Sequence, residues 1–242
     1  MRAVEQAMSI IEKALTEGRV ALTEVESKAL LAAYGIPTTR LGLANNVDEA
    51  AEIARSIGYP VAMKIISPDI LHKSDVGGVR LDVRSEEEAM VAYEETVALA
   101  RQARPEARIE GVSVQEMIVE TVAEVIVGAK RDPVFGPVIL FGLGGVWVDL
   151  MRDFSLRVVP FDQMEIAAMV EEIKGYPLLV GYRGSEPADV ASLANVISTI
   201  ARLMEDLPRI VELDLNPVCV RPDGRGAIVA DARVLLDSAN KS

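Results

Sequence analysis

Basic residues are in the minority in this 242-residue chain, which has 25 lysines and arginines against 37 aspartates and glutamates and a formal net charge of −12. Proteins that bind nucleic acid or anionic membranes without selectivity need a basic surface, because lysine and arginine neutralise the phosphates. The composition therefore argues against both of these classes. Any anionic ligand must be held by a local group of residues.

Cysteine and long apolar runs are also scarce. Cys219 is the only cysteine, so no internal disulfide is expected. No stretch approaches the roughly 18 apolar residues of a membrane-spanning helix. The first residues carry Glu5 and Glu12 within an apolar pattern, whereas a signal peptide has a basic start followed by an apolar block. We expect a cytoplasmic protein that does not enter a membrane.

Histidine occurs once, as His72, between an apolar strand-like run and the pair Gly77-Gly78. An imidazole with its ordinary pKa of about 6.5 is largely neutral at physiological pH and can act as a nucleophile. In this position it could accept a phosphoryl group and pass it on. A hydrogen-bonded histidine without chemistry is the alternative interpretation.

The order of apolar and polar residues predicts an α+β protein. Helical periodicity covers residues 3–17, and the capping-box sequence Thr23–Glu26 begins a second helix that ends near Gly35. Strands are then expected at 38–43, 61–66, 79–83, 112–118, 124–129 and 138–143, helices at 48–57, 85–104, 163–174 and 187–207, and a hairpin at 210–221 and 226–236. We predict an N-terminal helical segment (1–36) packed on a large subdomain (119–242), with a small subdomain at 37–118.

The terminal hairpin contains a candidate metal site. A two-residue turn at Asp223-Gly224 places Asn216 opposite Asp231. Asp214 lies on the same face because strand side chains alternate, and the opposite face would carry Leu213, Leu215 and Val229. Oxygen ligands of this kind suit Mg²⁺. A solvated sheet face is the alternative, and a β-bulge would break the register.

Lys64 and the glycine pair are candidates for phosphate binding. Lys64 interrupts the apolar strand at 61–66, where an ammonium group is costly unless an anion meets it or the head reaches water. The backbone amides of Gly77 and Gly78 could approach oxyanions because glycine has no side chain to hold a ligand away. An ordinary hairpin turn is the alternative for the glycines.

Four segments together resemble a known family. They are Ala62–Lys64, Leu71–Val79, Val114–Ile118 and Glu212–Pro217. The chain resembles the ATP-grasp superfamily and, more narrowly, the β subunit of ADP-forming acetyl-CoA synthetase (NDP-forming acyl-CoA ligase), a relative of the succinyl-CoA synthetase β subunit. The resemblance spans nearly the whole chain, and the block from His72 to Val79 is specific to that group. It implies an ATP-grasp fold of two α+β subdomains that enclose the nucleotide, with N-terminal helices.

The resemblance also implies a role for each matching residue. Lys64 matches the lysine that contacts ATP phosphates, and Gly77, Gly78 and Val79 match the loop that closes over them. The segment Gln115, Glu116, Met117 and Ile118 matches the hinge that lines the adenine pocket, with Glu124 on the ribose side. Asn216 and Asp231 match the Mg²⁺ ligands. Asp214 stands where the succinyl-CoA enzyme has glutamate, and is implied to bind metal or to orient a phosphohistidine.

The reaction implied is acyl-CoA + ADP + phosphate ⇌ acid + CoA + ATP. His72 would take phosphate from a phosphohistidine on a CoA-binding α subunit and deliver it to ADP, in a heterotetramer of two α and two β subunits. Two rivals are a carboxylate-amine ligase of the same fold, which needs no histidine, and a non-catalytic module that senses adenine nucleotide. The joint presence of His72, Asn216 and Asp231 argues against the sensor.

Overall fold

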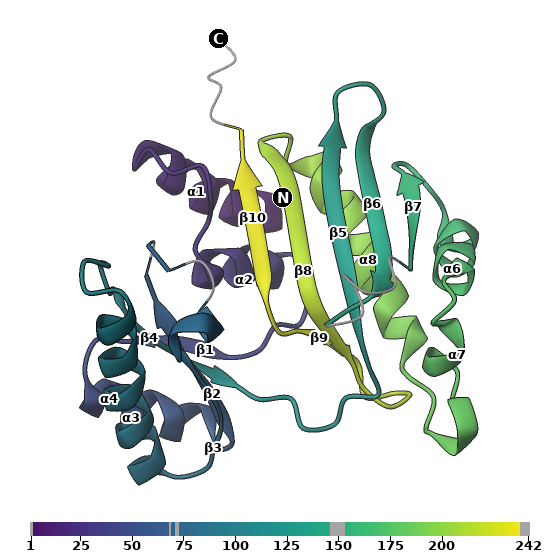
Figure 1. Cartoon of the computed structure of the whole chain (residues 1–242). Coiled ribbons are helices and arrows are strands. Elements are labelled where there is room, and N and C mark those ends of the chain that lie inside the picture. The colour runs from purple at the N-terminus through teal and green to yellow at the C-terminus, as the bar shows by residue number, and fades with distance from the viewer. Residues whose placement is uncertain (1, 68, 71–72, 146–152, 238–242) are drawn as a thin grey trace. The chain divides into compact units, whose positions relative to one another are not determined.

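The computed structural model describes residues 2–67, 69–70, 73–145 and 153–237. The chain forms two compact units, each with its own core (Figure 1). The large unit consists of residues 1–38 and 120–242, and the small unit of residues 39–119. No helix among the described residues is long and apolar enough to cross a membrane.

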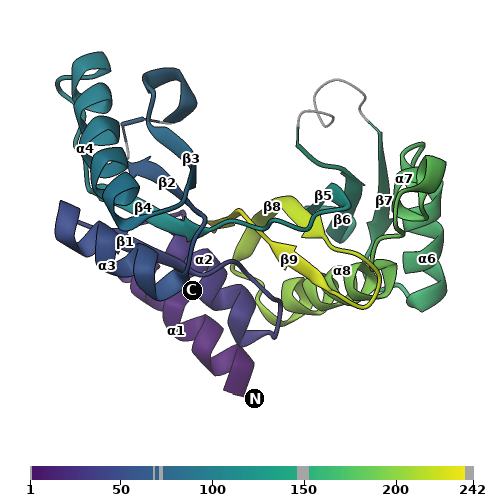
Figure 2. The same ribbon diagram turned by 90° about the horizontal axis from the view of Figure 1, so that it is seen from below.

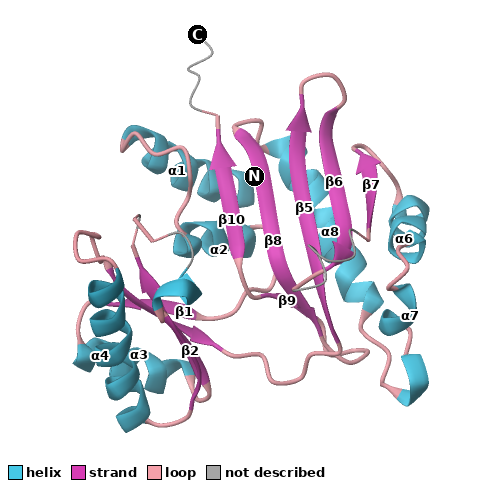
Figure 3. Ribbon diagram, in the orientation of Figure 1, coloured by secondary structure: helices cyan, strands magenta, loops and turns pink. Residues whose placement is uncertain are grey.

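The small unit is an antiparallel sheet covered on one face by two helices (Figure 3). Its strands are β1 (Leu41–Ala44), β2 (Val61–Ile66), β3 (Val79–Val83) and β4 (Gly111–Glu116), in the order β1-β4-β2-β3. Its helices are α3 (Val47–Ile57) and α4 (Glu86–Ala103), and a 3₁₀ turn, η1, covers Lys73–Val76. Asn46 and Ser85 begin the two helices, because their side chains accept the otherwise unpaired amides of Glu49 and Glu88.

The large unit is a second antiparallel sheet, in the order β10-β8-β5-β6-β7 with β9 paired to β8. Its strands are β5 (Ala123–Asp132), β6 (Gly136–Leu143), β7 (Phe154–Val158), β8 (Ile210–Val220), β9 (Ala227–Val229) and β10 (Ala232–Leu236). Its helices are α1 (Arg2–Thr16), α2 (Glu24–Ala33), α6 (Gln163–Glu172), α7 (Tyr176–Leu179) and α8 (Val190–Asp206), with a 3₁₀ turn, η2, at Tyr182–Gly184. Helices α1, α2, α6 and α8 lie on one side of this sheet (Figure 2) and share one apolar cluster with it.

Burial alternates along the large sheet because only one face meets the helices. On β5, Val125, Val127 and Ala129 are buried in the core, whereas Glu124, Ile126, Gly128 and Lys130 face outward. The candidate site residues of this sheet therefore lie on its outer face. Cys219 on β8, by contrast, is a buried free cysteine.

Both ends of α8 are tied to the sheet by charged side chains. Asp189 accepts hydrogen bonds from the amides of Ser192, in the first turn of the helix, and Gly226, at the tip of the β8–β9 hairpin. The Arg131 guanidinium on β5 donates to the carbonyls of Met204 and Leu207 at the other end. Helix termini leave amides and carbonyls unpaired, so these contacts stabilise α8 and fix the hairpin beside it.

Candidate functional site

The register of the terminal hairpin confirms the sequence-based pairing. Leu215 pairs with Ala232 on one side of the candidate site, and Val218 pairs with Val229 on the other. The amide of Ala230 donates to the carbonyl of Pro217. No register shift occurs between these pairs, so Asn216 lies opposite Asp231 as predicted. The second arm is divided into β9 and β10, with Asp231 in the short break between them.

A β-bulge lies on the other side of β8, at the same point. Val125 of β5 pairs with Val218, but Val127 pairs with Leu215, so β8 has one extra residue at Asn216–Pro217. Pro217 has no amide hydrogen for the ladder, which favours a bulge here. The bulge leaves the hairpin register intact and affects only how β8 meets β5. Bulges of this kind are common beside functional sites because they redirect a side chain.

Asp214, Asn216 and Asp231 are each partly buried on the outer face, whereas Leu213 and Leu215 are buried on the inner face, as predicted. Burial raises the pKa of Asp214, and the negative charges of Glu212 and Asp231 raise it further, against the lowering effect of Arg233. Asp214 and Asp231 thus repel each other electrostatically. A cation between such groups would relieve that repulsion.

Two further groups of the large unit approach Asn216. The amide of Gly145 donates to Oδ1 of Asn216 at 3.2 Å. The carbonyl of Glu124 accepts the amide of Gly144, and a Cβ on Gly145 would lie only 2.7 Å from Oε2 of Glu124. A side chain at position 145 would therefore displace the Glu124 carboxylate. The structure brings Glu124 and Asn216 together around Gly145.

The donor set of the hairpin fits Mg²⁺. The described residues contain no group of three or more histidine, cysteine, aspartate or glutamate side chains arranged to hold a metal. Mg²⁺ bound with a nucleotide does not need such a group, since it takes about one or two protein ligands together with waters and phosphate oxygens. Asn216 and Asp231 supply an amide and a carboxylate oxygen, and Asp214 adds a second carboxylate. Each is an oxygen donor of the type that this cation prefers.

In the small unit, Lys64 lies on the sheet face that the helices leave uncovered. Its neighbours Met63 and Ile65 are fully buried in the core, so alternation along β2 directs Lys64 to the other face. Lys64 pairs with Ser113 of β4 and Val79 of β3, which places these residues beside it. Lys64 is half-buried there, an arrangement that suits an ammonium group that binds an anion.

The glycine loop is closed by its own hydrogen bonds. The amide of Gly77 donates to the carbonyl of Ser74 at 3.1 Å, and the amide of Gly78 donates to the carbonyl of Lys73 at 2.8 Å. Gly77 has a φ of 66°, and a Cβ on Gly78 would lie 2.5 Å from Ile65. The structure therefore explains both glycines by backbone conformation and packing. That Gly77, Gly78 and Val79 contact phosphate stays a prediction.

The end of β4 carries the predicted adenine-binding segment. Gln115 is buried and donates from Nε2 to the hydroxyl of Thr39 at 2.9 Å, while the Glu116 carboxylate forms an ion pair with Arg40 at 3.1 Å. The Met117 amide donates to the carbonyl of Pro60 at 3.3 Å. Met117 and Ile118 follow the strand and are partly exposed. These contacts hold the segment in place. The contact with adenine itself remains a prediction.

His72 lies outside the described residues. Its proposed role as a phosphoryl carrier therefore rests on the sequence alone. Its described neighbours Lys73 and Asp75 belong to the 3₁₀ turn before the glycine pair.

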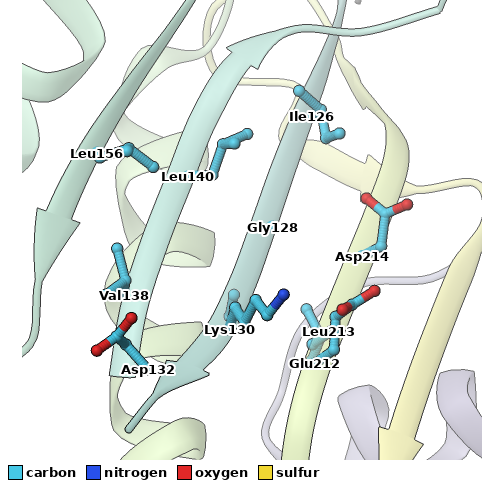
Figure 4. Close-up of a pocket in the computed structure, with 11 residues that line it drawn as sticks. Ile126, Gly128, Lys130, Asp132, Val138, Leu140, Leu156, Glu212, Leu213 and Asp214 are labelled. Carbon is cyan, nitrogen blue, oxygen red and sulfur yellow. The ribbon is translucent and has the colours of Figure 1, made fainter. Parts of the chain in front are cut away.

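A groove beside Asp214 was not predicted from the sequence (Figure 4). It has a volume of about 380 Å³ and lies on the outer face of the large sheet. Gly128 forms its floor between Ile126 and Lys130 of the same strand, with Leu140 and Leu156 on one side and Glu212 and Asp214 on the other. The strand β7, which supplies Leu156, was missed, although Phe154, Leu156 and Val158 alternate with more polar residues as a half-exposed strand does.

Comparisons with known proteins agree on the family. Residues 13–236 match the ATP-grasp domain family. The β subunit of ADP-forming acetate–CoA ligase II from Pyrococcus furiosus is 45% identical over 232 residues, which is 96% of this chain and 98% of that subunit. ADP-forming acetate–CoA ligase I of Archaeoglobus fulgidus is 47% identical over 96% of this chain, but the match spans only 33% of that longer protein.

Solved structures give the same result. Acetyl-coenzyme A synthetase 1 of Candidatus Korarchaeum cryptofilum, in complex with coenzyme A and Ca-AMPCP, has a chain that is 43% identical and superimposes with a TM-score of 0.90, covering 96% of this chain and 100% of that chain. Another structure of the same enzyme, with Mg-AMPPCP, has a phosphohistidine segment that points towards its nucleotide-binding site. The chain therefore belongs to the ATP-grasp family and, within it, to the group of ADP-forming acetate–CoA ligase β subunits, as the sequence motifs indicated.

Proposed function

We propose that this chain catalyses the nucleotide half of an ADP-forming acyl-CoA ligase reaction, with a CoA-binding partner subunit catalysing the other half. The observation that carries the proposal is the outer face of the β8 hairpin. There Asp214, Asn216 and Asp231 share one face, in a chain that matches an acetate–CoA ligase β subunit almost from end to end. The Archaeoglobus relative supports a partner subunit, because this chain corresponds to only a third of that protein, which carries the remaining sequence in the same chain.

The small unit would bind the phosphates and the base. Lys64 would neutralise phosphate charge from the uncovered face of β2, and the segment Gln115–Ile118 would line the adenine. Catalysis of phosphoryl transfer consists mainly of positioning and charge neutralisation, so no acid–base machinery is required of these residues. The hydrogen bond from Gln115 to Thr39 and the ion pair from Glu116 to Arg40 hold the segment in place.

The large unit would hold Mg²⁺ through Asn216 and Asp231, with Asp214 as a further ligand or as the group that orients a phosphohistidine. A bound Mg²⁺ would neutralise charge on the phosphate oxygens of ADP and ATP. Glu124 would contact the ribose. The hydrogen bond from Gly145 to Asn216 orients the amide side chain so that Oδ1 faces the Gly145 amide.

The phosphoryl group would pass through two histidines. In the first step a nitrogen of His72 attacks the phosphorus of a phosphohistidine on the partner, and the partner's P–N bond breaks as the new one forms. In the second step a β-phosphate oxygen of ADP attacks phosphorus on His72, which releases neutral imidazole and forms the P–O bond of ATP. Both steps are nucleophilic displacements that need no oxidant or further reactant.

Reconstitution tests the proposal. The chain would be mixed with a candidate CoA-binding partner, acetyl-CoA, Mg²⁺, ADP and phosphate, and ATP would be measured with luciferase. We expect ATP only when every component is present, and none with His72→Asn, which should still bind ADP within a few-fold. Undiminished ATP formation by His72→Asn would exclude the relay. If acetyl-CoA fails, aryl and branched acyl-CoAs should be tried before the assignment is rejected.

Chemical stability of the labelled protein separates the proposal from a carboxylate-amine ligase. A phosphohistidine formed from γ-labelled ATP is stable in base and labile in acid, whereas a ligase that forms a free acyl phosphate leaves no label on the protein. We expect base-stable, acid-labile label on this chain, and its absence from His72→Asn. A functional ligase without protein-bound label would favour the rival reaction.

A further inference from the structure

Asp82, on the edge strand β3 of the small unit, has an unusual backbone conformation. Its φ is 60°, in the left-handed region that residues other than glycine rarely adopt. The residue belongs to a β-bulge: between the pairs Val61–Val83 and Met63–Arg80, two residues of β3 stand where β2 has one. Bulges and left-handed residues of this kind are frequent at functional sites. The bulge at Asp82 therefore calls for an explanation.

Protection of the sheet edge explains only part of this conformation. β3 is the last strand in the order β1-β4-β2-β3, and a bulge discourages such a strand from pairing with another chain. That purpose does not require an amide to point in any particular direction. Nor does the side chain hold the backbone firmly, because Asp82 and Arg84 form their ion pair with side chains that are 50% and 69% exposed. The remaining feature to explain is the direction of the Asp82 amide.

The Asp82 amide points at the side chain of Met117. Its nitrogen lies 3.0 Å from Sδ of Met117 and donates to the sulfur. A thioether is a weak acceptor, so the contact fixes a position more than it contributes energy. Met117 directly follows β4, within the segment that the sequence predicts to line the adenine. The bulge thus joins β3 to the predicted base-binding segment.

The Met117 side chain crosses β2 to reach this amide, because β2 lies between β4 and β3 in the sheet (Figure 2). Ala62 is the residue of β2 that pairs with Gln115 and stands opposite the bulge. It lies two residues before Lys64 and therefore on the same face, which the helices leave uncovered. Ala62 is nevertheless only 5% exposed, which agrees with a methionine side chain stretched across its methyl group.

Met117 is held at both its main chain and its side chain. Its amide donates to the carbonyl of Pro60 at 3.3 Å, and its sulfur accepts the Asp82 amide. Methionine has three rotatable side-chain bonds and is otherwise adaptable. A side chain that is ordered before a ligand arrives loses less conformational entropy on binding. The two contacts therefore prepare Met117 for a ligand on the face that carries Lys64.

We propose that Asp82 is a positioning residue for the nucleotide base. Its left-handed backbone turns its amide to the sulfur of Met117 and fixes that side chain as an apolar wall of the base site. A thioether packs favourably against an aromatic ring, which suits a purine. The inference rests on the proposed function, in which the segment Gln115–Ile118 lines the adenine. Asp82 acts through Met117, and its carboxylate takes no part.

Two variants at position 82 separate the backbone from the side chain. Asp82→Gly and Asp82→Val both remove the carboxylate and its ion pair with Arg84. Glycine adopts the left-handed conformation freely, whereas a β-branched residue strongly disfavours it. Asp82→Gly should therefore keep the amide in place, and Asp82→Val should turn it away from Met117. Asp82 is exposed, so both variants should fold, which circular dichroism would verify.

Two further variants complete the set. Met117→Leu removes the sulfur acceptor and keeps an apolar side chain of similar volume. Arg84→Gln is the control, because it removes the ion pair with Asp82 and leaves the bulge and the sulfur contact untouched.

Calorimetry on the full chain would give the dissociation constants of Mg-ADP and of Mg-pyrophosphate, which has no base. We expect Asp82→Val and Met117→Leu each to raise the constant for Mg-ADP by about fivefold, with the double variant no weaker than either single one. Asp82→Gly and Arg84→Gln should stay within about twofold of the wild type. The affinity for Mg-pyrophosphate should be unchanged in all variants, because the contact serves only the base.

Three outcomes would overturn the positioning role: wild-type affinity for Mg-ADP in Asp82→Val, an equal loss in Asp82→Gly and Asp82→Val, or an equal loss of affinity for Mg-pyrophosphate. Exchange of label between ADP and ATP separates this role from the proposed function. If Asp82→Val loses affinity as expected but the wild type catalyses no exchange, the positioning role stands and the proposed function falls. If the wild type catalyses exchange and Asp82→Val binds Mg-ADP equally well, the proposed function stands and the positioning role falls.

Discussion

At the scale of single residues, the outer face of β8 separates groups by their chemistry. Leu213 and Leu215 point into the core, whereas Asp214 and Asn216 point away from it. Asp231 accepts the amide of Ala232 through one carboxylate oxygen at 2.9 Å. A carboxylate has several lone pairs, so this contact orients Asp231 and still leaves acceptor capacity for a cation.

The charge of Asp231 can be tested separately from its hydrogen bond. Asp231→Asn keeps an oxygen that can accept the Ala232 amide but removes the negative charge that a cation would need. We expect the dissociation constant for Mg-ADP to rise by about tenfold or more, since a charged ligand contributes on the order of 1–3 kcal/mol to the free energy of binding. Isothermal titration calorimetry with and without Mg²⁺ gives the measurement.

The control for this variant is Asp223→Asn, at the exposed tip of the same hairpin, which should bind Mg-ADP as the wild type does. Unchanged affinity in Asp231→Asn, or an equal loss in both variants, would contradict the assignment of Asp231 as a metal ligand.

Residue-level prediction succeeded where geometry followed from the sequence alone. An Asp-Gly turn and a strand period of two were enough to place Asn216 opposite Asp231. The same reasoning did not foresee the bulge at Asn216–Pro217, because the partner strand β5 is far away in the sequence. Nor did it show that the Gly77 and Gly78 amides bond to Ser74 and Lys73, since local loop closure depends on the conformation of the whole turn.

At the scale of elements, caps and ion pairs fix where helices begin. The capping box predicted at Thr23 is present, with the Thr23 hydroxyl accepting the Glu26 amide and the Glu26 carboxylate accepting the Thr23 amide. Arg19 donates to the same carboxylate at 2.7 Å. The hydrogen bonds from Arg19 lower the pKa of Glu26 to about 2, against the effect of partial burial. One side chain thus anchors the connection between α1 and α2.

This shift predicts a pH-dependent contribution to stability. The pKa of Glu26 is lower in the folded than in the unfolded chain, so its contribution is fully present above the unfolded value of about 4.5 and is lost as the pH falls towards 2. We expect Glu26→Gln to lower the free energy of unfolding by about 1–2 kcal/mol near neutral pH, allowing for partial solvent screening. Urea denaturation at several pH values would measure the difference.

The difference between wild type and Glu26→Gln should shrink as the pH falls below 4.5 and vanish near 2. A difference that stays constant across this range would show that the ion pair with Arg19 does not cause it. Glu12→Gln, at an exposed position of α1, serves as a control without a comparable ion pair to Arg19.

The connection between α8 and the hairpin gives a second prediction. Asp189 is 5% exposed, and its carboxylate accepts amides from both elements, which lowers its pKa despite burial. Asp189→Ala would leave two amides without this acceptor, so we expect a loss of about 2–3 kcal/mol in the free energy of unfolding. Chemical denaturation would measure it.

Asp162 provides the matched control for Asp189. It caps α6 through the amides of Met164 and Glu165 but is exposed and contacts no second element in this way. Asp162→Ala should therefore cost about 1 kcal/mol. Equal losses for the two variants would contradict the view that Asp189 also fastens the hairpin.

Most elements could be predicted from the sequence because periodicity and caps are local signals. β7 was missed because its alternation is the reverse of that of an ordinary exposed strand: the apolar Phe154, Leu156 and Val158 face outward, whereas Ser155 is buried and Arg157 is partly buried. The helix α7 was also missed, because it is only four residues long and has no side-chain cap. The groove depends on residues from β5, β6, β7 and β8 together, and such a long-range arrangement cannot be read from any single segment.

At the scale of the whole molecule, an acidic chain must hold an anionic nucleotide through local groups. The net charge of −12 repels phosphates at long range. In the proposed function, Lys64 on the small unit and the Mg²⁺ that Asn216 and Asp231 would hold on the large unit supply the local compensation. The same negative charge would favour a partner with a basic surface.

Exchange between labelled ADP and ATP, catalysed by this chain without its partner, tests the central claim most directly. If His72 takes a phosphoryl group from ATP and returns it to ADP, label introduced as ADP must appear in ATP. We predict Mg²⁺-dependent exchange that is absent from His72→Asn and at least about tenfold slower in Asp231→Asn. Tight binding of ADP and ATP with no exchange would contradict the account and would make the chain a nucleotide sensor.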